Sequence, residues 1–441
     1  MKLRLLLYLC AFSIFIRSTN AQDQIQLGGT WQFAIDSLDH GIEEQWFAKN
    51  MKETVILPGS MTENRKGNEI TISTHWTGDI LDSSYFKLPQ YEKYRQSENI
   101  KVPFWLQPEK YYVGAAWYRK VINIPSDWKG KSIELFFERC HWQSSVWIDA
   151  ECIGIQNALG APHMYDLTAK LSPGKHSITV CIDNRIKEIN PGVNSSSLTD
   201  HSQTNWNGIV GKMYLKASNA VNITSMKLFP DIYQKKVSIT LQIENRTEQN
   251  QKVDLSAQAV LQQKSLLKQS KHIELQPGSN EVSLEYEMGN DALLWDEFSP
   301  NLYSMKCEIS NKHFRDEKEE AFGLRKIATK KTQFTINDRL MYLRGTLECA
   351  VFPKTGYPPT DEKEWTRILK VCKAYGLNHM RFHSWCPPEA AFSAADRIGM
   401  YLYVECSSWA NQGATIGDGK PIDKYMYDES DRIINAYGNH P

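Results

Sequence analysis

Two residues able to bind polar groups stand at the end of a short predicted strand near the C-terminus. The strand spans His379–His383, and Arg381 and His383 lie on the same side of it because alternate residues of a strand share a face. Trp385 follows in the next loop. An arginine at an open strand end can donate hydrogen bonds to hydroxyl or carboxylate groups, and an indole offers an apolar face. These residue types can bind a ligand that has both polar groups and an apolar face.

A similar group follows the next predicted strand, Tyr401–Glu405. The strand ends on Glu405, and Trp409 and Asn411 lie in the loop beyond. Parallel strands that alternate with helices present such ends together on one active face. We therefore expect these side chains and those after His379–His383 to form one site.

Four of the candidates also have a structural alternative. Arg381 could pair with a carboxylate of the fold, and Glu405 could support its neighbours as a hydrogen-bond acceptor rather than touch a ligand. Trp385, and Trp206 much earlier in the chain, could be core residues, since a lone tryptophan is more often packed than exposed for stacking.

The elements that must position these residues are predicted from a change of periodicity after Thr329. Apolar residues recur at spacings of three and four in the predicted helices, and Asp361 is a predicted N-cap with Glu364 as its capping-box partner. The predicted elements are strands at Tyr342–Gly345, His379–His383 and Tyr401–Glu405, and helices at Glu362–Tyr375, Pro387–Gly399 and Ile422–Tyr437. Three β/α units predict an incomplete (β/α)8 TIM barrel over residues 328–441.

The preceding residues predict two all-β domains. Over residues 22–220, alternation such as Ile133, Leu135 and Phe137 between polar neighbours predicts an antiparallel sandwich of jelly-roll size. Over residues 221–327, a strict alternation at Val237–Ile243 and about seven short strands predict an immunoglobulin-like sandwich.

The composition limits the classes of partner that we expect the chain to bind. The 441 residues carry 51 basic and 51 acidic side chains, so charge favours neither nucleic acid nor an anionic membrane surface. The nine cysteines are scattered without a CxxC pair, which predicts mainly buried free thiols and disfavours a zinc site. No cofactor is predicted, and dependence on another metal ion stays open.

The N-terminus predicts export. Lys2 and Arg4 precede the apolar run Leu5–Ile16, and Thr19-Asn20-Ala21 supplies small residues for cleavage, so residues 1–21 are a predicted signal peptide. An uncleaved N-terminal anchor is the alternative. We expect a secreted or periplasmic protein with no membrane insertion after signal cleavage.

The order of several short motifs resembles glycoside hydrolase family 2, which includes β-galactosidases, β-glucuronidases and β-mannosidases. The resemblance covers nearly the whole mature chain and begins with an opening strand, two further sandwich strands and a closing strand. It continues through a junction and a first barrel strand to the segment that contains Arg381. These motifs are LGGTWQFAID (Leu27–Asp36), GAAWYRK (Gly114–Lys120), SSVWIDAECIG (Ser144–Gly154), NWNGIVGKMYL (Asn205–Leu215), FGLRK (Phe322–Lys326), YLRGT (Tyr342–Thr346) and GLNHMRFHSWCPPEAAFSAADRIGMYLYVE (Gly376–Glu405).

The resemblance implies a retaining exo-glycosidase that removes a terminal sugar from an oligo- or polysaccharide. The sugar could be that of a β-galactoside, a β-glucuronide or an arabinopyranoside. Cys349-Ala350 stand where many relatives carry His-Glu, which weakens a specific assignment as a β-galactosidase. The implied sugar-binding residues are Arg381, His383, Trp385, Glu405, Trp409 and Asn411, with Trp206 reaching over from the first domain.

The implied catalytic carboxylates fall outside this sequence. Such an enzyme needs an acid/base and a nucleophile about 5–5.5 Å apart. In the family the acid/base follows a segment like GNHP, which is Gly438–Pro441 here, and the nucleophile comes later. We therefore expect both beyond Pro441 and expect no hydrolysis by this chain alone. A non-catalytic carbohydrate-binding protein, or a truncated product without function, are the alternatives.

Overall fold

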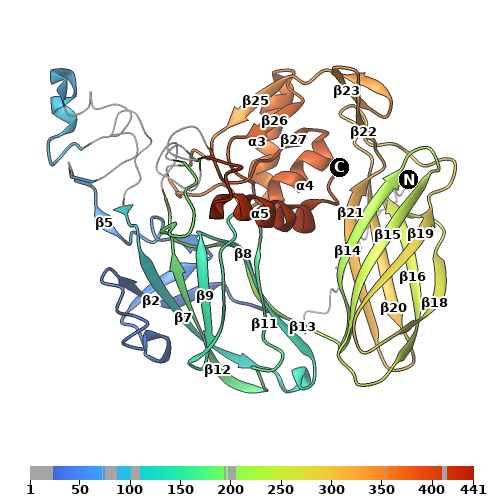
Figure 1. The fold of residues 1–441 in the computed structure, drawn as a ribbon, viewed down its shortest axis with the longest axis horizontal. Coiled ribbons are helices and arrows are strands. Elements are labelled where there is room, and N and C mark those ends of the chain that lie inside the picture. Colours follow the sequence, from blue (N-terminus) through green and yellow to red (C-terminus); the bar gives the residue numbers. More distant parts are fainter. Residues whose placement is uncertain are drawn as a thin grey trace, which may run out of the picture.

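The computed structural model describes residues 23–71, 73–74, 87–100, 110–192, 195–196, 205–352, 354–409 and 415–441. The predicted signal peptide and Asn411 lie outside these residues. The described chain forms three parts, which we call the first sandwich (24–218), the second sandwich (221–323) and the α/β unit (345–441). The α/β unit lies across the ends of the two sandwiches (Figure 1).

The first sandwich contains two antiparallel sheets with one shared core. The five-stranded sheet has the order β1-β13-β8-β11 with β4 paired to β13, and the six-stranded sheet has the order β10-β9-β12-β7-β2-β3. A separate pair, β5 and β6, lies beside them. The strands are β1 (Gln24–Gln26), β2 (Gly29–Asp36), β3 (Glu53–Leu57), β4 (Gly59–Ser60), β5 (Asn68–Glu69), β6 (Lys110–Tyr111), β7 (Ala115–Ile124), β8 (Ser132–Cys140), β9 (Gln143–Ile148), β10 (Glu151–Gln156), β11 (His163–Asp166), β12 (Gly174–Asp183) and β13 (Gly208–Ser218).

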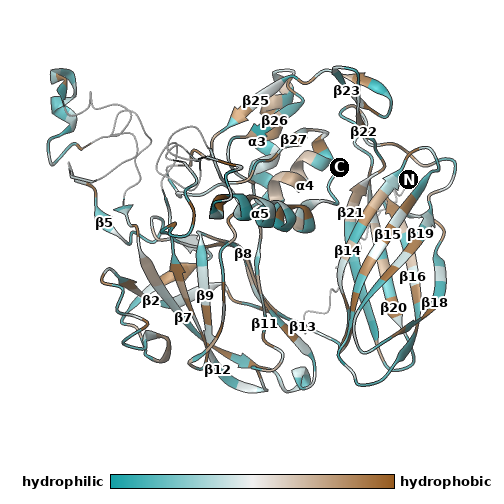
Figure 2. Cartoon of the chain, in the orientation of Figure 1, coloured by the Kyte–Doolittle hydropathy of each residue, from teal (hydrophilic) through white to brown (hydrophobic). Residues whose placement is uncertain are grey.

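The second sandwich continues from the first with strand β14. Its three-stranded sheet has the order β14-β15-β19, and its five-stranded sheet has the order β17-β16-β20-β21 with β18 paired to β16. Hydrophobic and hydrophilic residues alternate along these strands (Figure 2). The strands are β14 (Val221–Asp231), β15 (Lys236–Asn245), β16 (Gln251–Leu261), β17 (Lys264–Ser265), β18 (Gln269–Leu275), β19 (Gly278–Glu287), β20 (Leu302–Ser310) and β21 (Arg315–Gly323).

Alternation of apolar residues places the cores of both sandwiches as expected. Ile133, Leu135 and Phe137 on β8 are at most 2% exposed, and the four apolar residues of Val237–Ile243 on β15 are fully buried. Because successive side chains of a strand point to opposite faces, each alternating run lines one side of its sheet with apolar groups. The prediction of two successive all-β parts is confirmed.

The α/β unit has three parallel strands and three helices. Its sheet has the order β25-β26-β27, and a small antiparallel sheet of β22, β23 and β24 leads into it. These elements are β22 (Ile327–Lys330), β23 (Gln333–Ile336), β24 (Arg339–Met341), β25 (Gly345–Glu348), α3 (Glu362–Ala374), β26 (His379–Phe382), α4 (Glu389–Ile398), β27 (Tyr401–Tyr403) and α5 (Pro421–Tyr437). In the part of the chain that the structure describes, no helix is long and apolar enough to cross a membrane.

The first parallel strand begins three residues later than predicted, at Gly345 rather than Tyr342. The side chain of Asn378 causes this shift: its Oδ1 accepts a hydrogen bond from Arg344 N at 2.8 Å, and its Nδ2 donates to Tyr342 O at 3.0 Å. The amide therefore occupies backbone groups that a strand partner would otherwise pair. Regular pairing with β26 starts only at Gly345, opposite His379.

The start of α3 is partly as predicted. Asp361 is the N-cap, since its Oδ1 accepts a hydrogen bond from Glu364 N at 2.9 Å. The carboxylate of Glu364, however, pairs with Arg367 at 2.5 Å. This ion pair holds the side chain three residues further along the helix, away from the capping-box position.

The cysteines of the described residues are all free. Cys140, Cys181, Cys307 and Cys386 are buried, whereas Cys152 is exposed. Burial raises the pKa of the Cys307 thiol to about 12, which keeps it neutral and unreactive near pH 7.

Candidate functional site

The carboxyl ends of β26 and β27 bring Arg381 and Glu405 together. Arg381 lies opposite Leu347 of β25 and Tyr403 of β27 in the parallel register. Its Nε donates to Oε1 of Glu405 at 2.5 Å, and its guanidinium lies 5.9 Å from the centre of the Tyr403 ring. The hydrogen bond that Arg381 donates to Glu405 raises the pKa of Arg381 above its usual value. Arg381 therefore does pair with a carboxylate, and Glu405 does act as a hydrogen-bond acceptor for a neighbour. These are the structural alternatives stated for the two residues.

This ion pair leaves part of the guanidinium accessible. The side chain of Arg381 is 44% exposed, whereas that of Glu405 is 19% exposed. Only Nε of Arg381 bonds to Glu405, and Glu405 uses its second oxygen to accept from Ser384 N at 2.7 Å. Glu405 thus fixes the orientation of an arginine that stays partly exposed.

His383 stands at the same strand end and turns toward the first sandwich. Its ring lies 4.4 Å from that of Trp409 at an angle of 90°, and its Nδ1 is 3.5 Å from Ser196 Oγ. Burial lowers the pKa of His383, Glu405 opposes this shift and Arg381 adds to it. The histidine is therefore neutral at pH 7 and shares its surroundings with both charged groups.

The loop after β27 is tied to the first sandwich. Trp409 N donates to Pro191 O at 2.9 Å, and Ser408 Oγ donates to the same carbonyl at 3.2 Å. These bonds hold the Trp409 ring beside His383. Asn411, the other candidate in this loop, lies outside the described residues, so its predicted role stays a prediction.

The two remaining tryptophan candidates are packed. Trp385 is 2% exposed, lies 5.1 Å from the Phe382 ring, and donates its Nε1 to Glu348 O at 3.2 Å. The packing alternative therefore describes Trp385: the ring supports the strand ends and has no free face for a sugar.

Trp206 does reach over from the first sandwich, but its contact is with protein. It is 5% exposed and lies 5.6 Å from the ring of Tyr357 in the loop between β25 and α3. Tyr357 donates to Glu63 at 2.8 Å, and Ser60 Oγ donates to Thr355 O at 2.6 Å. Trp206 thus helps to clamp this loop onto the first sandwich.

Glu348 ends β25 next to the paired charges. Its Oε2 accepts a hydrogen bond from Ala350 N at 2.8 Å, yet burial raises the pKa of the carboxyl to about 7. Cys349 follows, with Arg381 and Glu405 among its charged neighbours. The strand ends therefore carry two carboxyls in different surroundings: Glu405 is bound by Arg381, and Glu348 is buried and has a raised pKa.

Several contributors were not predicted. Ser384, Pro191, Ser196 and Tyr357 hold the candidates in place through backbone groups or long-range contacts. The left-handed φ of 58° at Ser384, which aims its N–H at Glu405, has no clear sequence marker because serine is not typical of that conformation. Among the described residues, no group of three or more potential ligand side chains is arranged to hold a metal ion.

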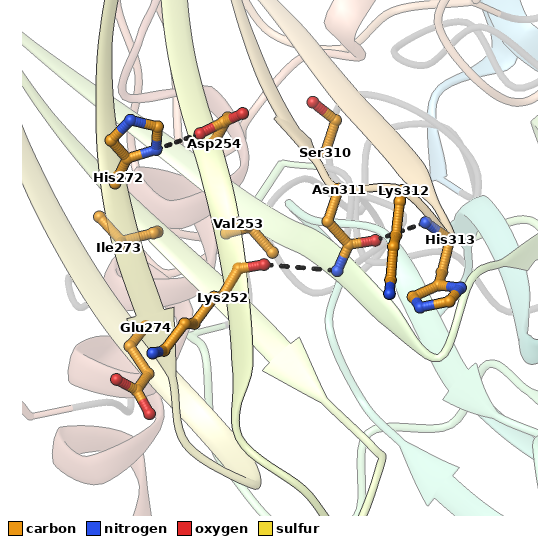
Figure 3. A pocket seen from close by; sticks show the side chains of 10 residues that line it. All are labelled: Lys252, Val253, Asp254, His272, Ile273, Glu274, Ser310, Asn311, Lys312 and His313. Atoms are coloured by element: carbon orange, nitrogen blue, oxygen red, sulfur yellow. Dashed lines mark hydrogen bonds and ion pairs between the residues drawn. The ribbon is translucent and has the colours of Figure 1, made fainter.

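A separate hollow of about 680 Å³ lies on the second sandwich (Figure 3). His272 and Asp254 form an ion pair at its edge, and Asn311 Nδ2 donates to Lys252 O at 3.4 Å. The side chains of His272 and Asp254 are 94% and 61% exposed, so the pair stays solvated. None of the predicted site residues lies there, and an exposed pair of this kind contributes little to binding.

Comparison with known proteins places the fold. The model for "Glycosyl hydrolases family 2, sugar binding domain" matches residues 25–218, and the model for "Glycosyl hydrolases family 2" matches residues 221–325. A β-galactosidase from Leuconostoc mesenteroides is 23% identical over 437 residues, which are 95% of this chain and 39% of that enzyme.

Solved structures agree in fold. A β-glucuronidase from glycoside hydrolase family 2 has a TM-score of 0.74 at 19% identity, over 95% of this chain and 42% of that one. Bacteroides uniformis β-glucuronidase 2, covalently bound to cyclophellitol-6-carboxylate aziridine, has a TM-score of 0.71 at 18% identity, over 95% and 46%. The chain thus spans less than half the length of these relatives. Together, the two family models and the shared fold show that the chain belongs to glycoside hydrolase family 2.

Proposed function

We propose that this chain supplies the terminal-sugar subsite of a family 2 exo-glycosidase of the β-galactosidase or β-glucuronidase type. The Arg381–Glu405 pair carries the proposal, because it sets a partly exposed, oriented cation at the open ends of parallel strands. Guanidinium groups bind hydroxyl and carboxylate oxygens well. His383 and Trp409 add a polar edge and an apolar face beside it.

The α/β unit would form the first three units of a (β/α)8 barrel. Three observations support this: the sheet is parallel, each strand is followed by a helix, and the candidate residues stand at carboxyl ends. The sheet also leaves apolar side chains uncovered, since Leu347 and Tyr403 are 52% and 53% exposed. Further barrel strands would cover them.

The reaction would be hydrolysis with retention of configuration, in an exported protein. Retention needs an acid/base and a nucleophilic carboxylate about 5–5.5 Å apart. Glu405 is engaged by Arg381, and Glu348 is held by Ala350 N, so neither is free to act as such a pair. Export rests on the basic and apolar run at Lys2–Ile16.

Binding of free sugars tests the subsite without requiring turnover. Saturation-transfer NMR on the whole chain should detect galactose, glucuronate or arabinose, with p-nitrophenyl glycosides left unhydrolysed. Arg381→Ala should weaken this binding at least about tenfold, since a lost charged hydrogen-bond partner costs about 1.5–3 kcal/mol. Arg367→Ala, at an exposed arginine on α3, is the matched control. Equal binding by the Arg381→Ala variant and the parent would refute the subsite.

A further inference from the structure

A cleft of about 610 Å³ lies where the three parts of the molecule meet, since residues of both sandwiches and of α5 line it. Strands β8, β11 and β13 of the first sandwich form its floor, and β14 of the second sandwich forms one wall. The C-terminal end of α5 closes the top. None of the predicted site residues that the structure describes lines this cleft.

Contacts between each pair of parts hold the cleft open. Arg246 of the second sandwich pairs with Asp166 of β11 at 3.0 Å, and Lys212 of β13 pairs with Glu389 of α4 at 2.6 Å. Asn439, just after α5, accepts from Leu228 N at 2.9 Å and donates to Met226 O at 2.8 Å. Ion pairs and hydrogen bonds therefore join each pair of parts around the cleft.

The floor has an apolar half that the strand register sets side by side. Met164 of β11, Phe136 of β8 and Tyr214 of β13 are direct neighbours across the three strands. The rings of Phe136 and Tyr214 stack with their centres 4.7 Å apart, and both side chains are half-buried. This row offers a rigid apolar surface of the kind that packs against the C–H groups of a sugar ring.

The adjacent row of the floor is charged with both signs. Glu134 lies directly opposite both Asp166 and Lys216, and this row is two residues along the strands from the apolar row. A ligand of strong positive or negative charge would meet a like charge here, which disfavours its binding. A neutral ligand rich in hydroxyl groups can instead donate to the carboxylates and accept from the ammonium.

The wall formed by β14 adds a buried polar group without a protein partner. Asn222 lines the cleft, is 8% exposed, and its Oδ1 has no hydrogen-bond partner among the described residues. A buried acceptor left unpaired destabilises the folded chain. The hydroxyl of Thr224 and that of Ser225 line the same wall. Asn222 and these hydroxyls make this wall of the cleft polar.

We propose that this cleft is a second, non-catalytic binding site for a neutral oligosaccharide. A sugar chain combines apolar ring faces with hydroxyl edges, which match the Phe136–Tyr214 row on one side and the charged row and Asn222 on the other. The site would hold a polysaccharide near the barrel face while the terminal sugar is processed elsewhere. It depends on no residue of the Arg381 cluster.

A microarray of neutral oligosaccharides, probed with the whole chain, tests this site, and isothermal titration of the best binder measures its affinity. Tyr214→Ala should weaken binding about tenfold or more, and Ser225→Trp, which fills the cleft, should abolish it. Phe229→Ala is the matched control, since Phe229 is an exposed aromatic residue of β14 outside the lining. Circular dichroism of each variant checks the fold.

Two results would overturn the proposal. One is an array on which no neutral oligosaccharide is bound. The other is binding that survives both Tyr214→Ala and Ser225→Trp, because the bound sugar would then lie outside the cleft. Loss of binding in Arg381→Ala with no effect of Ser225→Trp would assign the sugar to the barrel face instead.

Discussion

Glu429 of α5 lies against Gly160 of the first sandwich, and its Oε1 accepts a hydrogen bond from Gly160 N at 2.5 Å. The same oxygen accepts from Leu159 N at 3.1 Å, and Glu429 is fully buried. A Cβ atom at position 160 would lie 2.9 Å from this oxygen, so only glycine allows the approach. Arg432 pairs with the second oxygen at 3.3 Å.

A buried charged side chain of the first sandwich, Arg139, binds groups of the α/β unit across the same interface. Arg139 of β8 donates to Pro387 O at 2.5 Å and to Tyr437 Oη at 3.1 Å, and it also donates to Leu159 O at 2.6 Å. Each part therefore supplies a charged group to satisfy backbone atoms of the other. These contacts fix the position of the strand ends that carry Arg381 relative to the Pro191 segment, whose carbonyl binds Trp409.

Glu429→Ala should lower the free energy of unfolding by about 2–4 kcal/mol, because it leaves two buried N–H groups and Arg432 without their acceptor. Urea unfolding followed by tryptophan fluorescence measures the change. Asp431→Ala, at an exposed carboxylate of the same helix, should change stability by no more than about 0.5 kcal/mol. Equal stability of the two variants would show that the interface does not depend on Glu429.

Substitutions of Trp385 and Trp409 should affect different properties. The first should lower stability, and the second should weaken sugar binding. Trp385→Ala should destabilise the α/β unit by about 3–5 kcal/mol, since it empties a buried site among Phe352 and Phe382. Trp409→Ala should change the thermal midpoint little but weaken sugar binding, because its ring is only half-buried beside His383. Thermal unfolding and saturation-transfer NMR on both variants make the comparison. The reverse pattern would return Trp385 to the sugar subsite.

Glu348 should give stability a pH dependence. Burial raises its pKa from 4.5 to about 7, so between these values the folded chain keeps a proton that the unfolded chain has lost. Stability therefore falls as pH rises through this window and levels off above pH 7. Glu348→Gln cannot ionise and should remove about 1–3 kcal/mol of that fall. Urea unfolding at half-unit steps from pH 4.5 to 8 measures it; parallel curves for parent and variant would contradict the shift.

Local patterns were enough to predict most elements of the fold. The alternation at Val237–Ile243 specified a buried strand face, and Asp361 specified the start of α3. The small sheet of β22 to β24 was missed, although Asn337-Asp338 marks its second turn. Both residues have left-handed φ, at 50° and 64°, as a tight hairpin turn requires.

The site was less predictable because its geometry depends on distant residues. The sequence placed Arg381 and Glu405 at neighbouring strand ends, and the structure brings them into contact. No spacing indicates that Pro191 holds Trp409, or that Trp385 turns into the core while Trp409 stays at the surface. Such choices are made by packing between parts far apart in the chain.

A crystal structure of the whole chain soaked with a terminal sugar is the most direct test of the proposed sugar subsite at Arg381. Galactose and glucuronate would be tried in turn, with difference density examined at both candidate sites. We expect a sugar within hydrogen-bond distance of the outer nitrogens of Arg381, with the Trp409 ring alongside. Density that avoids Arg381 in a well-occupied complex, with the Arg381–Glu405 pair unchanged, would contradict it.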